Sequence, residues 1–414
     1  MEPAAPVARS STRVSTGATT TIARRQTNTG PGLRPSSSRR LPADVRFADP
    51  EDGILFDLEP DDELALVLET ARRLAREELV PPMRTHEADR AISPALASSW
   101  EEVGLSTLDV PIELDGAGMG CLARVFVNEA LAEGDVGAAI ALDPYGTALV
   151  ALLEVGGLEA ARTLREATGD GARRALFVDA RDALVSEDDA GLTLDVPWVA
   201  ADEAVALVLL DENGVCLVTE GLAFDSVRGA GIRAAGGGRL RLDGAPVAGR
   251  WENAEGAGRA RARARLHTAS LLLGVLSASC TFSANYAQER QAFGRPIAHH
   301  QALAFLITDM RIALDAARLV VHEAAWRVDQ RLPCETEAAS AFAEVIEVGR
   351  TIGPNGVQIL GGHGFMADYP VEKHMREARA LSLLHGGFDA AIEDAGQALI
   401  AQERPLGLGQ EGAL

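Results

Sequence analysis

The feature that most constrains the fold is a change of hydrophobic period in the middle of the chain. Between about 172 and 250, short apolar runs such as "AVALVLLD" and "GVCLVTE" are bounded by Gly, Asp, Asn and Pro, which is typical of strands joined by tight turns. On both sides of this stretch, apolar residues recur with the helical period of 3.6. The sequence therefore predicts an α+β architecture in which a small β-domain separates two helical regions.

Local signals at helix ends support this division. Acidic residues open the periodic stretch "DDELALVLETARRLAREELV", which follows Pro60 and ends at Pro81. Ser93 followed by Pro94 predicts the N-cap and first position of a second helix. We expect an N-terminal helical domain over 54–160, a reduced middle β-domain over 172–250, a C-terminal four-helix bundle over 256–403 and a flexible tail over 404–414.

Residues 1–46 differ in composition from the rest of the chain. They hold eight arginines against two acidic residues and are rich in Ser, Thr, Pro and Gly without apolar periodicity, so we expect a disordered tail. Such an Arg- and Ser-rich start also resembles an organelle transit peptide, but it lacks an amphipathic apolar face.

Charge and composition exclude several classes of protein. The net charge of −21 argues against nucleic acid as a partner, because binding of phosphates requires a basic face. The longest apolar stretch starts at Thr268 and is interrupted by Ser, Thr, Cys and Asn, so we expect a buried core helix and no membrane span. The four cysteines are far apart and have no histidine at metal-ligand spacing, which indicates reduced thiols in a cytoplasmic protein and no metal site.

Two long motifs in the last third of the chain narrow the interpretation further. The stretches "YAQERQAFGRPIAHHQALAFLITDM" (286–310) and "GVQILGGHGFMADYPVEKHMREAR" (356–379) resemble, in order and spacing, the C-terminal domain of the FAD-dependent acyl-CoA dehydrogenases. "GIRAAGGGRLRLDGAPV" (231–247) resembles the end of that family's β-domain, and "VPIELDGAGMG" (110–120) resembles a loop of its N-terminal helical domain. Two motifs in the right order are more specific than one glycine-rich loop. The chain is thus identified as a divergent member of this family.

The resemblance implies a homo- or hetero-oligomer of acyl-CoA dehydrogenase-type subunits, with FAD where subunits meet. It implies an acyl-CoA or acyl-carrier thioester as substrate and an electron-transfer partner as electron acceptor. It places Arg290, Phe293 and Gln301 along the adenine and pyrophosphate part of the flavin nucleotide. A guanidinium suits phosphate oxygens because it donates two parallel hydrogen bonds.

The second motif is expected to reach the same cofactor from a partner subunit. By resemblance, Gln358, Gly361 and Gly362 of "QILGG" make this approach, and glycines allow the backbone to come close to a dianion. Read without the family, "GGHG" would be an ordinary turn and Phe293 an ordinary core ring.

Two departures from the family pattern concern the flavin ring. Members usually carry a "TEPGAGSD"-like loop at the entry to the β-domain and later a "WIT" strand against the ring. Here "ALFVDARDALVSED" stands in place of the loop, and "LTLDVPWVAADEAVALVLL" lacks the strand motif. Trp198 is either a relic of that motif or a core tryptophan.

A third departure concerns the proton-abstracting base. The family's reaction removes the proton beside the thioester carbonyl with a carboxylate, usually from an "EGT" sequence, while a hydride leaves the β-carbon for the flavin. Aligning "SLLHGGFDAA" places His385 at that carboxylate, and the alternative position on an earlier helix falls on Ala264. A neutral imidazole can accept a proton, but a histidine at a helix end also serves simply to bind the last carbonyls.

Three functions remain open from the sequence. The first is FAD-linked α,β-dehydrogenation of an acyl thioester, either with the chain's own FAD or as a base-lacking subunit that shares a flavin site with a partner subunit. The second is a non-redox acyl-thioester enzyme that uses His385. The third is a catalytically silent structural partner.

Overall fold

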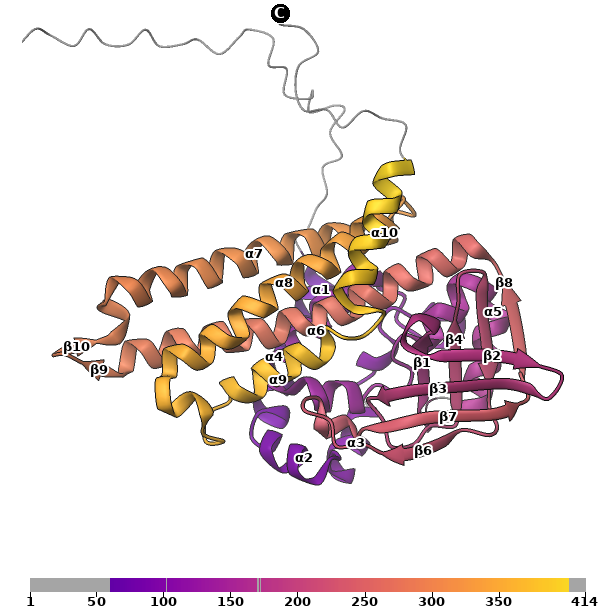
Figure 1. Cartoon of the computed structure of the whole chain (residues 1–414), viewed down its shortest axis with the longest axis horizontal. Helices are drawn as coiled ribbons and strands as arrows, with labels where there is room; N and C mark the ends of the chain where they lie inside the picture. The colour runs from indigo at the N-terminus through magenta and orange to yellow at the C-terminus, as the bar shows by residue number, and fades with distance from the viewer. Residues whose placement is uncertain (1–59, 102, 170, 172, 402–414) are drawn as a thin grey trace, which may run out of the picture. The chain divides into compact units, whose positions relative to one another are not determined.

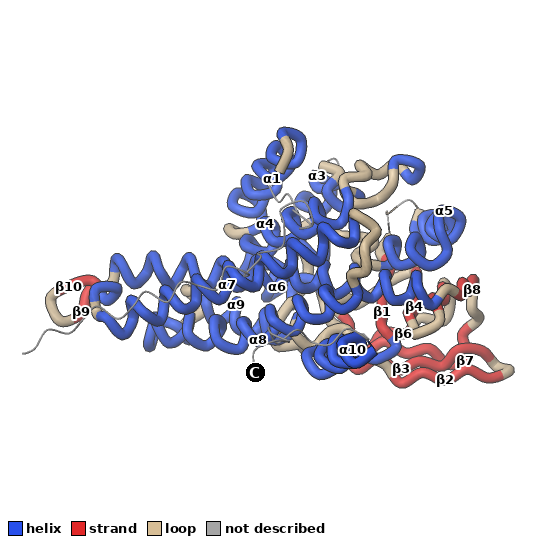
Figure 2. Tube along the Cα trace, turned by 90° about the horizontal axis from the view of Figure 1, so that it is seen from above, coloured by secondary structure: helices blue, strands red, loops and turns tan. Residues whose placement is uncertain are grey.

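The computed structural model describes residues 60–101, 103–169, 171 and 173–401. The tails expected over 1–46 and 404–414 lie outside these residues. The predicted α+β architecture is confirmed, with helices before and after a pair of small sheets. Figures 1 and 2 show long helices side by side, with the sheets near one end of them.

Two of the N-terminal helices begin at residues whose side chains cap the helix. Asp61 accepts a hydrogen bond from the Leu64 amide at 2.8 Å, and Ser93 accepts one from the Leu96 amide at 3.3 Å. One π-helical turn, η1 (Ala75–Leu79), extends the first helix. The α-helices are α1 (Asp62–Leu74), α2 (Met83–Asp89), α3 (Pro94–Glu101), α4 (Gly120–Ala141) and α5 (Ala148–Thr168).

The middle of the chain forms two four-stranded sheets that pack on each other. The first has the order β1-β4-β5-β8, with β1 parallel to β4 and the other pairs antiparallel. The second has the order β2-β3-β7-β6 and is antiparallel throughout. Buried apolar side chains of both sheets, such as Leu194 and Leu209, form one core. The strands are β1 (Ala175–Asp179), β2 (Leu184–Asp188), β3 (Gly191–Val199), β4 (Ala206–Leu210), β5 (Gly214–Val218), β6 (Ala223–Ser226), β7 (Gly238–Ala245) and β8 (Gly249–Glu252).

The C-terminal part is a helical bundle built around α6. This helix is buried along most of its length, and its alanines, leucines and small polar residues allow neighbours to approach closely. It is long and apolar enough to span a membrane by length and composition, but 78% of its most apolar window is buried inside the protein, as expected for a core helix. The helices are α6 (Ala254–Glu289), α7 (Gln301–Asp329), α8 (Glu335–Leu360), α9 (Val371–Leu381) and α10 (Gly387–Ala401).

A short hairpin joins α6 to α7 at the end of the bundle away from the sheets (Figure 1). It consists of β9 (Gln291–Ala292) and β10 (Arg295–Pro296), which pair antiparallel. Phe293 and Gly294 turn the chain between them with φ of 54° and 80°. A glycine adopts this left-handed backbone without strain, whereas phenylalanine does so at a cost.

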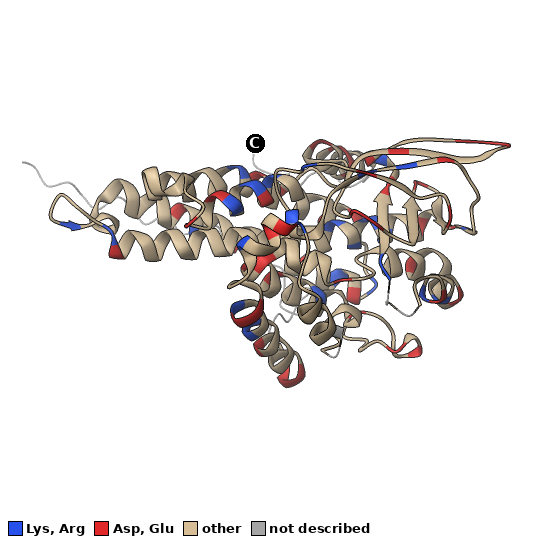
Figure 3. Ribbon diagram, turned by 90° about the horizontal axis from the view of Figure 1, so that it is seen from below, with Lys and Arg blue, Asp and Glu red and all other residues tan. Residues whose placement is uncertain are grey.

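The sole lysine of the chain ties α9 to α4. The Lys373 side chain is 2% exposed, and its ammonium lies 2.8 Å from Asp135 and also pairs with Glu377. Asp135 interrupts the helical backbone of α4, with φ of −156°. Charged positions are interspersed over the N-terminal helices, whereas long stretches of the bundle helices carry none (Figure 3). Lys373 is a buried ionic link between α4 and α9.

Candidate functional site

A cavity of about 870 Å³ lies between the β-domain and helices α8 and α9. Trp198, near the end of β3, and the glycine-containing loop 229–231 form its β-domain wall. Arg350 of α8 and Arg379 of α9 line the opposite side, and much of the remaining lining is apolar. The cavity therefore presents an aromatic ring on one side and guanidinium groups on the other.

Polar groups around this cavity indicate which kind of ligand it can bind. The indole nitrogen of Trp198 is buried and has no hydrogen-bond partner in the described part of the chain. Arg350 packs its guanidinium 4.6 Å above the Phe388 ring and pairs with Glu347, whereas no ion-pair partner of Arg379 is found between residues 60 and 401 where the chain is described. A flat, anionic ligand fits a cavity lined by an aromatic ring and guanidinium groups.

A second cavity of about 130 Å³ adjoins the first. Residues 175–178 of β1, together with Thr268 and His385, are among its lining. Three side chains border both cavities, namely those of Asp182, Trp198 and Leu384. These three form the wall between a space large enough for a nucleotide cofactor and a space suited to a small acyl group.

His385 is buried on the side of the smaller cavity. Its Nε2 lies 2.8 Å from the Thr268 hydroxyl, and its Nδ1 has no partner among the described residues. Burial lowers the pKa of His385 to about 4, so the imidazole is neutral at pH 7. The role of proton acceptor for His385 stays a prediction, and such a low pKa makes the ring a weak acceptor. The alternative base position, Ala264, is a fully buried alanine of α6.

The backbone at residue 385 binds a carboxylate from the β-domain. The amides of His385 and Gly386 each donate a hydrogen bond of 2.7 Å to Asp182, one to each carboxylate oxygen. Positive φ values at residues 385 and 386 turn both amides in the same direction. Burial raises the pKa of Asp182 to about 6 despite these two bonds. Asp182 belongs to a short 3-10 turn (Ala180–Asp182) directly after β1.

The three cofactor residues expected from the first motif lie at the hairpin end of the bundle. Arg290 follows the last residue of α6, Gln301 begins α7, and both are exposed. The ring of Phe293 is 95% exposed. Arg290 lies 22 residues beyond Thr268 on α6, which is roughly 33 Å along a helix at 1.5 Å per residue. The hairpin is therefore far from His385 of the same chain.

The second set of expected cofactor residues lies where α8 ends. Gln358 is exposed in the last turn of α8, and Gly361 and Gly362 are exposed in the following 3-10 turn, η7 (Gly361–Phe365). A side chain added at either glycine would meet no atom within 4 Å, so open space lies beside this backbone. All six predicted cofactor residues are thus on the surface, and none lines the two cavities described above.

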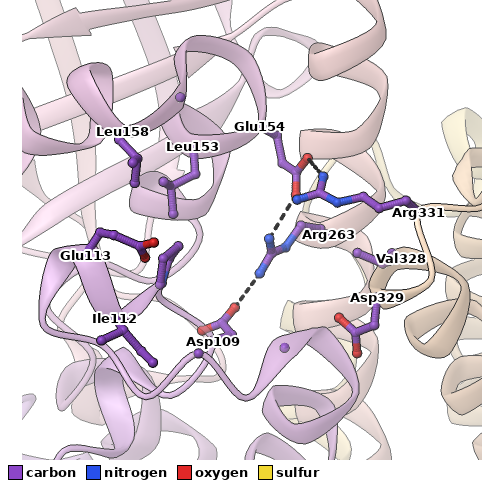
Figure 4. A pocket seen from close by; sticks show the side chains of 14 residues that line it. Asp109, Ile112, Glu113, Leu153, Glu154, Leu158, Arg263, Val328, Asp329 and Arg331 are labelled. Atoms are coloured by element: carbon purple, nitrogen blue, oxygen red, sulfur yellow. Dashed lines mark hydrogen bonds and ion pairs between the residues drawn. The ribbon is translucent and has the colours of Figure 1, made fainter.

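A third cleft, of about 570 Å³, is dominated by ion pairs (Figure 4). Arg263 bridges Asp109 at 2.7 Å and Glu154 at 2.9 Å, and Arg331 also pairs with Glu154. Burial alone would raise the pKa of Asp109, but the guanidinium groups of Arg124 and Arg263 lower it to about 2. The charges here satisfy one another, which assigns the cleft to structural support rather than to cofactor binding.

Comparison with known proteins identifies the family. The model of the acyl-CoA dehydrogenase N-terminal domain matches residues 61–163, and that of the acyl-CoA dehydrogenase C-terminal domain matches residues 257–400. The chain belongs to the acyl-CoA dehydrogenase family. The resemblance inferred from the motifs is confirmed.

Individual relatives of this acyl-CoA dehydrogenase family chain agree with the assignment. The chain is 27% identical over 357 residues to a mitochondrial short-chain specific acyl-CoA dehydrogenase of Sus scrofa, covering 78% of this chain and 86% of that protein. Butyryl-CoA dehydrogenase from Megasphaera elsdenii has a similar fold, with a TM-score of 0.72 and 20% identity over 83% of this chain and all of that one.

Two further solved structures share the fold. One is the ChsE4–ChsE5 complex from Mycobacterium tuberculosis, with a TM-score of 0.72 and 23% identity over 84% of this chain and all of the matched chain. The other is PigA, determined with FAD and proline, with a TM-score of 0.71 and 19% identity over 83% of this chain and 99% of that one.

Sequence reasoning missed Asp182 and left Trp198 undecided between relic and core. The structure places Trp198 in the wall of both cavities. Asp182 stands in "ALFVDARD", the stretch that replaces the family's hydroxyl-bearing loop, and an acid in that substituted loop was the available signal. Its contact with residue 385 spans 203 positions and depends on the packing of two domains.

Proposed function

We propose that this chain takes part in FAD-linked α,β-dehydrogenation of an acyl thioester, in an assembly where a flavin site is shared between subunits. The large cavity of one subunit holds the flavin ring, and the hairpin of a second subunit of the same fold covers the nucleotide end. The second subunit is a further copy of this chain or a related chain that carries its own base.

The observation that carries the proposal is the exposure of Phe293. Phe293 is 95% exposed on a strained turn with φ of 54°, and its ring meets its own chain only edge-on at His300, with the ring centroids 6.0 Å apart, among the described residues. Arg290 stands three residues before it and is exposed as well. An aromatic ring beside a guanidinium suits an adenine and a phosphate, and both residues project where only another molecule can cover them.

The lining of the large cavity supports the other half of the site. Trp198 offers an aromatic face, and Arg379 offers a cation for an electron-rich ring or a phosphate. Gly229 and Gly231 allow their loop to pack closely in this wall, because a side chain at either position would meet the Trp198 indole or the Arg376 backbone. FAD supplies the acceptor for the hydride, and the chain's own groups would hold it, orient it and exclude water around it.

In the non-redox alternative, His385 must accept a proton at neutral pH. With a pKa of about 4, its conjugate acid would be too strong for efficient acceptance, because a general base works best when its pKa is near the working pH. In the proposed dehydrogenation, His385 does not need to accept a proton. Its ring is then a neutral neighbour of the acyl group.

The test is the colour and reactivity of the purified full-length chain, prepared alone and after co-expression with a base-bearing chain of the same family. A shared flavin site predicts bound FAD in at least one of these preparations and its bleaching by butyryl-CoA without oxygen. If both preparations stay colourless after incubation with FAD, the proposal fails.

A further inference from the structure

We propose that Asp182 supplies the proton acceptor that positions 264 and 385 lack, so that this chain carries a relocated carboxylate base. The inference rests on the proposed dehydrogenation and assigns its proton-transfer step to a residue of the β-domain. Asp182 would then be a catalytic residue in direct contact with the α-carbon of the acyl group.

Asp182 lies between the two cavities, where the base of a dehydrogenation is needed. Among the residues that the structure describes, Asp182 is the one carboxylate that lines both the cofactor-sized cavity and the small cavity beside His385. In a dehydrogenation, the acyl carbon that loses a proton must lie beside the carbon that loses a hydride, so the base must border both spaces. Asp182 meets this requirement, whereas the His385 ring lines only the small cavity.

The Asp182 carboxylate is held in place by two backbone amides. The two amide hydrogen bonds from His385 and Gly386 fix the carboxylate at the backbone of the residue where the family usually carries its base. Each carboxylate oxygen accepts one of these bonds and keeps a free lone pair for a proton. The carboxylate is therefore held rigidly and remains able to accept a proton.

In the proposed reaction, the acyl thioester loses one proton and one hydride. The α-carbon gives its proton to an Asp182 oxygen, the β-carbon loses its hydrogen with an electron pair to the oxidised flavin of the proposed function, and a carbon–carbon double bond forms. Asp182 becomes a neutral acid, and the thioester is oxidised by two electrons. No further reactant is needed.

The electrostatic surroundings of Asp182 favour this chemistry. Burial raises its pKa to about 6, and the nearby Asp179 carboxylate adds to the rise, whereas the His385 and Gly386 amides and the Arg181 guanidinium oppose it. The imidazole of His385, which lines the small cavity together with Asp182, stays neutral at this pH. A base with a pKa of about 6 is charged at pH 7 and still has appreciable basicity.

The experiment follows exchange of the α-protons of butyryl-CoA with D2O by mass spectrometry, in the assembly and in its flavin-free form. Exchange needs the base but no oxidation, so it reads out proton transfer alone. Asp182→Asn should lower the exchange rate about 10²- to 10⁴-fold, the usual contribution of a positioned base. In the wild type, the rate should rise with pH around pH 6, and this rise should vanish in Asp182→Asn.

The matched control is Asp211→Asn. Asp211 also accepts two backbone amides, from Asn213 and Gly214 at 2.7 and 2.8 Å, but it lines neither cavity. The Asp211→Asn variant should therefore exchange the α-protons at the wild-type rate. Asp182→Glu, which keeps the carboxylate, should retain part of the exchange, and thermal unfolding of each variant reports whether it is folded.

Different results would overturn the assignment of Asp182 as the base and the proposed dehydrogenation. If the assembly binds FAD and is bleached by butyryl-CoA, but folded Asp182→Asn exchanges and bleaches like the wild type, the base belongs to a partner and the inference is overturned. If no preparation binds FAD, the proposed function fails first. Loss of exchange in Asp182→Asn alone, with FAD still bound, supports the inference.

Discussion

The imidazole of His385 and the hydroxyl of Thr268 lie 2.8 Å apart, in a buried contact between α6 and the turn before α10. Phe177 and Phe342 stand beside the ring, with centroids at 5.8 and 6.1 Å. His385 is thus a neutral ring in a buried, aromatic setting.

This burial predicts acid sensitivity. The pKa of His385 falls from 6.5 in the unfolded chain to about 4 in the folded one, so only the unfolded state gains a proton between these values. Stability should fall as pH drops through this window, by about 3 kcal/mol from this group. His385→Gln should reduce the slope of unfolding free energy against pH between 6.5 and 4, measured by urea titration. The exposed His299→Gln should leave the slope unchanged, and an unaltered slope in His385→Gln would contradict the buried, neutral ring.

Replacing Lys373 should be strongly destabilising. Lys373→Met would leave Asp135 and Glu377 buried without their cation, at a cost of about 3–5 kcal/mol. The control Arg162→Met breaks an exposed ion pair with Glu159 and should cost less than about 1 kcal/mol. Chemical denaturation at pH 7 measures both, and equal losses in the two variants would refute the buried link.

The ion pairs of Figure 4 predict a second pH effect, at lower pH. Asp109 has a pKa of about 2 in the folded chain, below its ordinary value of 3.8, so its contribution is present above pH 3.8 and is lost as pH falls toward 2. Asp109→Asn should cost about 2 kcal/mol at pH 7. Asp115→Asn, which removes an exposed carboxylate 3.1 Å from Arg165, should cost less than about 1 kcal/mol. Unfolding curves that coincide for the two variants at pH 7 would contradict this difference.

Most of the fold could be predicted from the chain because it depends on local pattern. The helical period, the Ser93 cap and the run of short strands each reflect contacts within a few residues of sequence. The apolar stretch from Thr268 became the buried helix α6, since its small polar residues are compatible with close helix packing.

The centre of the site could not be predicted in the same way. Asp182 meets the backbone of residue 385, and Lys373 meets Asp135 across 238 positions, so neither contact leaves a local trace. Lys373 is the sole lysine of the chain, but composition alone indicates no role for it. Trp198 was ambiguous because a tryptophan in a strand reads the same whether it faces a core or a cavity.

The two halves of the proposed flavin site predict distinct single-residue effects. Arg290→Ala should lower the flavin bound per chain without changing stability, because Arg290 is exposed and follows the last residue of α6. Leu383→Trp, at a position 62% exposed on the wall of the large cavity, should lower it by filling the space for the ring. Arg162→Ala is the control for loss of an exposed arginine and should leave flavin content unchanged. Flavin absorbance per chain measures all three, and full retention in both site variants would contradict the assignment.

The most direct test of the shared site is complementation between these two variants. Arg290→Ala keeps an intact cavity, and Leu383→Trp keeps an intact hairpin, so co-expressed chains can combine one intact half from each. The account predicts that the mixed assembly binds more flavin per chain than either variant alone. A mixed assembly with no more flavin than the single variants, beside a yellow wild-type assembly, would contradict it.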